Sequence, residues 1–313
     1  MKLTVRAAVA VGTAAAIGIG AVGAGFGARS SGTGGGLAVR DGTDWVTWWR
    51  RDRAPARWDA RAPLAERVAW RPGAAGLEWG ELQLRGAGEA WRTRLVVVRL
   101  SPESIALSLA PAFADDRGWK VRQVDSSAAL AVDAGQFRGR SPWGWVVAGG
   151  RELLSPQLAP LAAAVVIDAA GRVRIVAPDS VEAERRTGAA VEAFQSYPML
   201  LHNGIVPSAL LEAGRGVDLE HRDARLGLGV LEDGRVIVAL TRFDALGEKL
   251  GQVPFGLTSP EMAAVMGALG CREALLLDGG ISGQLLLRDS AGTARVWNGT
   301  RSVPLGLVGR PRR

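Results

Sequence analysis

The chain has 313 residues, 48% of them hydrophobic and 22% charged, so it can form one large domain or two ordinary ones and is not a disordered protein. The formal net charge is +7 and comes mainly from arginine, because Lys2, Lys120 and Lys249 are the only lysines. The arginines are scattered and no nucleic-acid-binding motif accompanies them, which argues against a nucleic-acid partner.

Residues 1–29 have the pattern of an export signal. Lys2 and Arg6 precede an uncharged run from Ala7 to Ala28 that is about long enough to span a bilayer. A cleaved signal peptide and an uncleaved signal-anchor both fit this pattern. We therefore expect an exported protein, either periplasmic, secreted or anchored to the outer side of a membrane through its N-terminus.

Residues 30–72 are expected to form a linker and a segment rich in tryptophan and arginine. Residues 30–36 read SSGTGGG, which is typical of a flexible linker. Trp45, Trp48 and Trp49 lie at helical spacing, with arginines just after them. Such a segment could lie on a membrane surface or pack against the domain, and we favour packing.

A single domain is expected over residues 73–313. Strand-like alternation recurs at 77–84, 95–100, 104–109, 129–132, 145–147, 164–167, 173–176, 226–231 and 236–240. Ala170-Gly171 and Asp233-Gly234 are typical of hairpin turns. A helix is expected over 180–193, and a second one begins at Thr258, where TSPE predicts a capping box. The pattern predicts an α+β fold, in which a large mixed or antiparallel sheet is packed by a few helices.

Four segments end strands with polar residues and glycines. They are AVDAGQF (131–137), QSYPMLLHNG (195–204), HRDAR (221–225) and LLLDGGISGQ (275–284). Paired glycines let a backbone approach a ligand, and a carboxylate at the end of a buried strand can have a shifted pKa. Cys271, the only cysteine, cannot form an internal disulfide and is expected to be a buried structural residue.

In their order along the chain, these segments resemble the phosphodiester glycosidase family, over roughly residues 77–308. The block from Gly256 to Ser282 carries the most specific part of the resemblance. The chain departs from the family pattern at Asp133, where asparagine is usual, and at Ile281, where a third glycine is common.

The resemblance implies hydrolysis of the bond between a sugar's anomeric carbon and a phosphodiester oxygen, in envelope or exopolysaccharide metabolism. We expect Asp133 and Asp278 to be the carboxylate pair, with His221 or Asp223 assisting proton transfer. The expected substrate-binding residues are Gly135, Gln136, Gln195, Ser196, Asn203, Arg225, Arg242, Thr258, Gly279, Gly280 and Ser282. Arg225 or Arg242 would neutralise the phosphate.

No cofactor is required by this pattern, although the carboxylates and Asn203 leave room for a divalent cation. The expected ligand is a glycan or a sugar phosphodiester. One alternative is an envelope protein that binds or assembles glycans on the same fold without cleaving them. Another is a basic protein that binds membrane surfaces.

Overall fold

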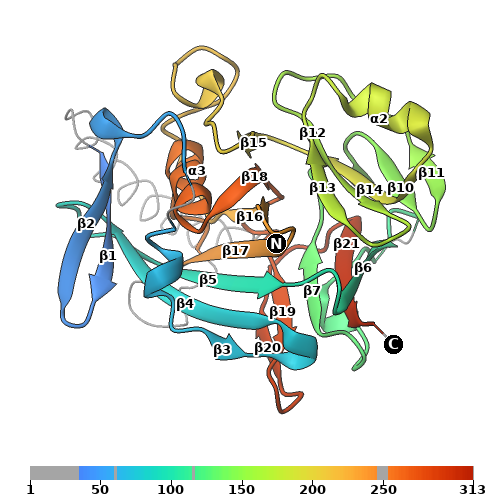
Figure 1. Cartoon of the computed structure of the whole chain (residues 1–313), viewed down its shortest axis with the longest axis horizontal. Coiled ribbons are helices and arrows are strands. Elements are labelled where there is room, and N and C mark those ends of the chain that lie inside the picture. The colour runs from blue at the N-terminus through green and yellow to red at the C-terminus, as the bar shows by residue number, and fades with distance from the viewer. Residues whose placement is uncertain (1–34, 60–61, 115–116, 245–252, 313) are drawn as a thin grey trace, which may run out of the picture.

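The computed structural model describes residues 35–59, 62–114, 117–244 and 253–312. The expected export signal lies outside these ranges. Every strand pairing within them is antiparallel. The α-helices of the described ranges are α2 (Val181–Thr187) and α3 (Ser259–Ala268), and neither is long and apolar enough to cross a membrane. The predicted α+β fold, rich in antiparallel sheet and forming one domain, is confirmed (Figure 1).

Three sheets make up most of the molecule. The largest has the order β15-β18-β16-β17-β5-β4-β1-β2, with β3 beside β4. Its strands are β1 (Gly36–Asp41), β2 (Asp44–Arg50), β3 (Arg71–Pro72), β4 (Glu78–Gly86), β5 (Arg92–Leu100), β15 (Met199–Leu201), β16 (Leu226–Leu231), β17 (Val236–Phe243) and β18 (Cys271–Leu276).

The other two sheets have five strands each. One has the order β11-β10-β14-β12-β13, from β10 (Val146–Ala148), β11 (Arg151–Leu154), β12 (Ala163–Asp168), β13 (Val173–Val176) and β14 (Ala190–Ser196). The other has the order β20-β19-β7-β21-β6, from β6 (Ile105–Pro111), β7 (Leu130–Asp133), β19 (Leu285–Arg288), β20 (Ala294–Trp297) and β21 (Leu305–Pro311). The short strands β8 (Phe137–Arg138) and β9 (Ser141–Pro142) pair with each other.

The central strands of the nine-stranded sheet are buried on both faces. In β5, Val96 and Val98 point into a core shared with the two five-stranded sheets, whereas Leu95 and Val97 point to the core that contains α3. A continuous apolar run suits a strand that is covered on both sides. Each such side chain contributes about 1.5–3 kcal/mol through burial.

Helix α3 forms where the capping signal predicted it. The Thr258 hydroxyl accepts a hydrogen bond from the Glu261 N–H, and the Glu261 carboxylate accepts one from the Thr258 N–H. All ten residues of the helix are buried. Gly270 follows the helix with a φ of +93°, a conformation that favours glycine.

The helix expected over 180–193 is wrong in its second half. Helix α2 ends at Thr187, and Gly188 caps it in the left-handed conformation at φ +65°. The following residues form β14, which pairs with both β10 and β12. A central position in a sheet outweighed the local helical preference.

The tryptophan segment forms a strand, not a helix. Trp45, Trp48 and Trp49 belong to β2, whose partner β1 also pairs with β4. Trp49 is buried and Trp48 half-buried against the same core as α3, so the packing interpretation is confirmed for both. The large sheet therefore extends on the N-terminal side of residue 73, where we had expected the domain to begin.

Candidate active site

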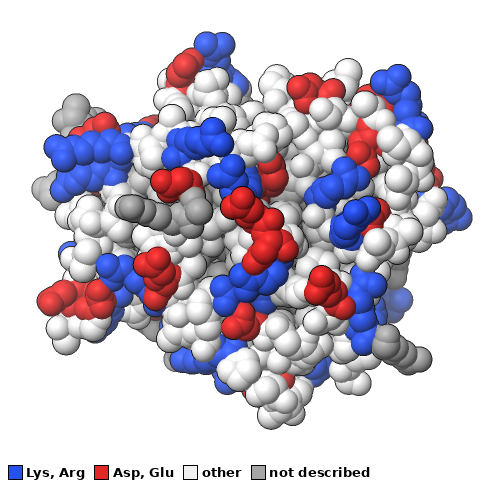
Figure 2. All heavy atoms as spheres, viewed as in Figure 1, with Lys and Arg blue, Asp and Glu red and all other residues white. Residues whose placement is uncertain are grey.

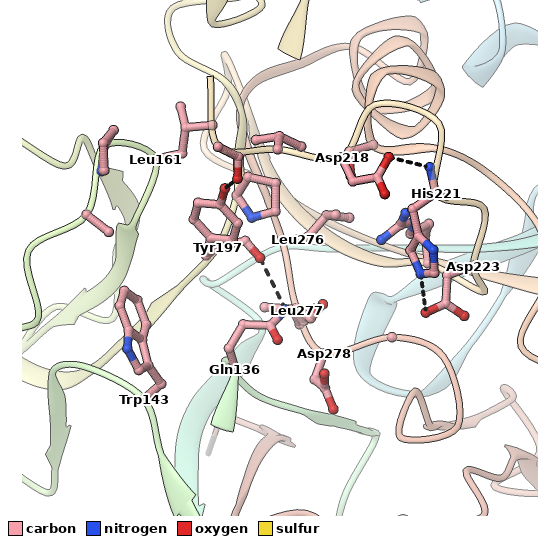
Figure 3. Close-up of a pocket in the computed structure, with 18 of the residues that line it drawn as sticks. Gln136, Trp143, Leu161, Tyr197, Asp218, His221, Asp223, Leu276, Leu277 and Asp278 are labelled. Atoms are coloured by element: carbon pink, nitrogen blue, oxygen red, sulfur yellow. Dashed lines mark hydrogen bonds and ion pairs between the residues drawn. The ribbon is translucent and has the colours of Figure 1, made fainter. Parts of the chain in front are cut away.

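A pocket of about 670 Å³ lies where several strand ends meet. It takes Gln136 from beyond β7, Tyr197 from beyond β14, Asp223 and Arg225 from before β16, and Asp278 from beyond β18. Figure 3 shows Asp218, His221 and Asp223 at one end of this pocket and Trp143, Leu161 and Tyr197 at the other. The pocket thus has an ionisable end and an apolar, aromatic end.

The turn after β18 places Asp278 next to Asp223. The Asp278 N–H donates to the Gly135 carbonyl, and the Gly280 N–H donates to the Ala224 carbonyl. A Cβ at Gly279 would lie 2.3 Å from the Ala224 oxygen, and one at Gly280 would lie 2.9 Å from a carboxylate oxygen of Asp223. The two glycines are therefore required for this close approach of the turn to residues 223–225.

The segment 221–225 is held by backbone contacts and by Arg225. The guanidinium of Arg225 donates from Nε to the Leu257 carbonyl and from Nη2 to the His221 carbonyl. Among the described residues, Nη1 has no hydrogen-bond partner, and Arg225 lines the pocket. The His221 Nε2 lies 3.8 Å from the Asp223 Oδ2, within ion-pair distance. One cation and one imidazole therefore accompany the carboxylate.

The carboxyl groups of Asp278 and Asp223 hold their protons more tightly than usual. Burial raises the pKa of Asp278, opposed by a hydrogen bond from Ser282 and by the charge of Arg301. Burial also raises the pKa of Asp223, opposed by the charges of Arg225 and His221. The negative charge of Asp223 further raises the pKa of Asp278. Two neighbouring carboxyls of this kind can divide acid and base roles between them.

Residues 126–308 match the sequence profile of the family described as phosphodiester glycosidase. The chain belongs to the phosphodiester glycosidase family. Among curated proteins, none matches the chain significantly in sequence.

Solved structures show that the fold of this phosphodiester glycosidase domain is shared. The zebrafish N-acetylglucosamine-1-phosphodiester alpha-N-acetylglucosaminidase catalytic domain, auto-inhibited by its pro-peptide, aligns with a TM-score of 0.55 at 13% identity, over 82% of this chain and 96% of that one. A hypothetical protein from Synechocystis aligns with a TM-score of 0.55 at 16% identity, over 89% of this chain and 68% of that one. At these identities the likeness concerns the fold alone.

Six residues expected at the site line the pocket of this phosphodiester glycosidase domain: Asp278, His221, Asp223, Arg225, Gln136 and Gly279. The Gln136 side chain donates to the Tyr197 and Leu277 carbonyls and so closes the wall between two strand ends. Gly280 and Ser282 lie just behind this wall, in contact with Asp223 and Asp278 respectively.

Asp133 and Arg242 do not line the pocket. Asp133 is 1% exposed and accepts a hydrogen bond from the Gln284 N–H, while Arg242 is 6% exposed and donates to the Gly283 and Asn298 carbonyls. Burial raises the pKa of Asp133 well above its usual value and lowers the pKa of Arg242 to about 10. Both side chains lie beneath the pocket, where they contact the chain that carries Ser282.

The other expected site residues have local structural contacts. The Gln195 side chain bonds to the backbone of Trp145, Gln157 and Ala162, and the Ser196 hydroxyl donates to the Leu276 carbonyl. A Cβ at Gly135 would lie 2.9 Å from the Gln195 carbonyl oxygen. Thr258 caps α3. Asn203 lies in an exposed turn beside His202 and Glu273, outside the pocket.

Several lining residues were absent from our expected site, among them Tyr197, Asp218 and Trp143. Tyr197 donates its hydroxyl proton to the Gly216 carbonyl, and Asp218 accepts hydrogen bonds from the Glu220 and His221 N–H groups. Trp143 lies at the same end of the pocket as Tyr197, away from Asp218 (Figure 3). The position of Tyr197, the only tyrosine, inside the second polar segment was the one signal in the sequence.

The described residues contain no group of three or more His, Cys, Asp or Glu side chains that could hold a metal ion. On the face shown in Figure 2, basic and acidic side chains are interspersed. This pattern fits the many arginine–carboxylate pairs of the surface, such as Arg185 with Glu152 and Arg310 with Asp125.

Proposed function

We propose that this protein is an exported hydrolase that cleaves the bond between a sugar's anomeric carbon and a phosphodiester oxygen. The observation that supports this most directly is the meeting of Asp278, Asp223, His221 and Arg225 in one pocket of a phosphodiester glycosidase domain. The name of the zebrafish neighbour describes the same bond type. Export to the cell envelope, and a role in envelope or exopolysaccharide metabolism, belong to the proposal through residues 1–29.

The ionisable end of the pocket would bind the reacting group. Arg225 would bind the phosphate, because a guanidinium stabilises the charge that develops on the departing oxygen. Asp278 would face the anomeric carbon, where a carboxylate stabilises the oxocarbenium-like transition state. Asp223, with His221, would exchange a proton with the attacking water.

The reaction balances with water as the only co-substrate. The anomeric C–O bond breaks, and the phosphate monoester leaves with the bonding electron pair. Water supplies a hydroxyl group to the anomeric carbon and a proton to the leaving phosphate. Because a phosphate is a good leaving group, the departing oxygen does not need a general acid beside it.

The apolar end of the pocket would bind the sugar. Trp143, Tyr197 and Leu161 form a wall there, and the polar atoms of Gln136 lie beside it (Figure 3). Small-molecule sites commonly combine such an apolar lining with a few fixed polar groups. In this arrangement the anomeric carbon lies between the aromatic wall and Arg225.

Release of free sugar from synthetic sugar-1-phosphodiesters tests the proposal. We expect turnover by the wild-type protein and a loss of about 10²- to 10³-fold in Asp278→Asn, the order seen when a group that stabilises transition-state charge is removed. Asp52→Asn, at an exposed position in the turn Arg51–Arg53, is the control and should keep full activity. Tight glycan binding without turnover across a panel of sugars would instead favour the glycan-binding alternative.

A further inference from the structure

The peptide group between Gly283 and Gln284 lies between two buried ionic side chains. Its carbonyl accepts a 2.5 Å hydrogen bond from the Arg242 Nη2, and its N–H donates a 2.8 Å hydrogen bond to the Asp133 Oδ1. The cation therefore lies at the negative end of the peptide dipole and the anion at the positive end. Charge-assisted hydrogen bonds of this kind are about twice as strong as neutral ones.

Asp133 and Arg242 come from different sheets. Asp133 ends β7, which pairs with β19 in a five-stranded sheet, whereas Arg242 belongs to β17 of the nine-stranded sheet. The peptide precedes β19 and is held from both sheets at once. Within the described residues, neither side chain forms an ion pair, and the Asp133 Oδ2 has no hydrogen-bond partner.

Burying two ionic groups that do not touch each other is costly. Their burial is apparent in their titration, because it raises the pKa of Asp133 and lowers that of Arg242, and the charge of each opposes the shift of the other. Fold stability alone does not account for the arrangement, since an apolar pair of similar volume is often as stable or more so. A role in fixing the position of the peptide does account for it.

The peptide is connected to the active pocket through Ser282. Ser282 is 3% exposed and lies four residues after Asp278 on the same turn, where hydrogen bonding by its side chain lowers the pKa of the Asp278 carboxyl. The N–H groups of Ser282 and Gly283 both donate to the Gly279 carbonyl, so residues 279–283 form one compact turn. The Gln284 side chain adds a bond to the Ser282 carbonyl. Any shift of the 283–284 peptide would therefore move the Ser282 hydroxyl away from the Asp278 carboxyl.

We propose that Asp133 and Arg242 are positioning residues, which fix the 283–284 peptide so that Ser282 holds the Asp278 carboxylate in place. Asp133 and Arg242 would thereby act on a pocket that they do not line. It rests on the proposed function only for its effect on turnover. Its effect on Asp278 itself can be measured without any substrate.

The experiment compares two variants at one position. Asp133→Asn keeps an oxygen that can accept from the Gln284 N–H but removes the negative charge, whereas Asp133→Ala removes both. The difference between them isolates the hydrogen bond to the peptide. If Asp133→Ala does not fold, Asp133→Leu, which fills the site but cannot accept, replaces it.

The closing measurement is an NMR titration of the Asp278 carboxyl carbon in ¹³C-aspartate-labelled, substrate-free protein, with Asp278→Asn as the assignment control. The charged groups that shift the pKa of Asp278 are Arg301 and Asp223, and both are kept in every variant. Neither Asp133→Ala nor Asp133→Asn has a charge at position 133, so a charge there cannot account for a difference between them. We expect a higher pKa for Asp278 in Asp133→Ala than in Asp133→Asn. In Asp133→Ala the 283–284 peptide is released, so Ser282 no longer forms its hydrogen bond to Asp278. In the Ser282→Ala background this difference should vanish.

Turnover provides the second readout. We expect kcat to be about tenfold lower or more in Asp133→Ala than in Asp133→Asn, with KM unchanged, and again no difference in the Ser282→Ala background. Equal Asp278 pKa values in the two variants, or a difference that persists without Ser282, would overturn the inference. If no sugar diester is hydrolysed, the proposed function fails, whereas the titration still decides the positioning role.

Discussion

Arg222 and Glu261 are joined by two hydrogen bonds, of 2.7 and 2.9 Å, that tie the loop carrying His221 and Asp223 to the first turn of α3. The Glu261 side chain is only 4% exposed, and the guanidinium of Arg222 also lies over the Trp91 ring. We expect Glu261→Ala to destabilise the protein by about 3 kcal/mol, because it leaves a half-buried cation without its partner and removes half of the capping box.

Chemical denaturation measures this change. The control is Arg235→Ala, which removes a solvent-exposed pair with Asp233 and should cost no more than about 0.5 kcal/mol. A similar decrease in the free energy of unfolding in the two variants would contradict the importance assigned to the Arg222–Glu261 pair.

Gly280→Ala should impair catalysis more than stability. Its φ of +55° and its 2.9 Å approach to the Asp223 carboxylate mean that a methyl group is strained and displaces that carboxylate. We expect a loss of about 1–2 kcal/mol in the free energy of unfolding and a decrease of about 10- to 100-fold in kcat. Gly292→Ala is the matched control, since it has a φ of +80° and no described atom within 4 Å of its Cβ. It should show the same strain with full activity.

Asp133 should make the protein less stable as the pH rises. Burial raises its pKa in the folded state above the unfolded value, so its favourable contribution is complete at low pH and is lost as the pH rises through the folded pKa. We therefore expect the free energy of unfolding of the wild type, relative to Asp133→Asn, to fall as the pH rises from about 4.

Asp233→Asn should give the opposite slope. Arg235 lowers the pKa of Asp233, so the wild type should gain stability relative to this variant as the pH rises through the acidic range. Denaturation series at several pH values measure both slopes. Parallel slopes in the two comparisons would be inconsistent with a pKa of Asp133 that burial raises.

Arg225→Gln should weaken binding of the phosphate. We expect inorganic phosphate, as a product-like inhibitor, to bind at least about tenfold more weakly, because a charge-assisted hydrogen bond is lost. Arg138→Gln, which removes an exposed cation at the pocket rim, should change the inhibition constant by less than about threefold. If only Arg138→Gln has an effect, the phosphate binds at the rim and not beside Asp223.

Cys271 should be inert to thiol reagents in the folded protein. It is 1% exposed at the start of β18, and burial raises the pKa of its thiol, which suppresses the reactive thiolate. A colorimetric thiol assay should detect no thiol under native conditions and one thiol in denaturant. Fast labelling of the native protein would show that β18 opens on the time scale of the assay.

The sequence could predict which chain segments approach one another but not where each side chain points. Asp278, Asp223, His221 and Arg225 were expected together because strand ends rich in glycine and polar residues signal a site, and they share one pocket. Asp133 ends a strand in the same way, yet its side chain faces the interior between two sheets. That orientation depends on which strands lie beside β7, and periodicity within one strand carries no such information.

Partner strands also explain the other differences. The residues after Gly188 have a composition that allows a helix, and only their pairing with β10 and β12 makes them extended. Trp45, Trp48 and Trp49 have helical spacing, but they belong to β2, which pairs with β1 from Arg50 to Asp44 and passes Trp48 in a bulge. Structures that depend only on neighbouring residues, such as the helix cap at Thr258 and the hairpin turn at Asp233-Gly234, were predicted correctly.

The insertion of β21 between β6 and β7 has a consequence for how the protein matures. Residues 305–311 pair with residues 105–111 on one side and with 130–133 on the other, so β6 and β7 do not pair with each other. This sheet therefore stays incomplete during folding until the last strand has docked. The interior that contains Asp133 closes only at that step, because β21 joins two strands that lie far from it in the sequence.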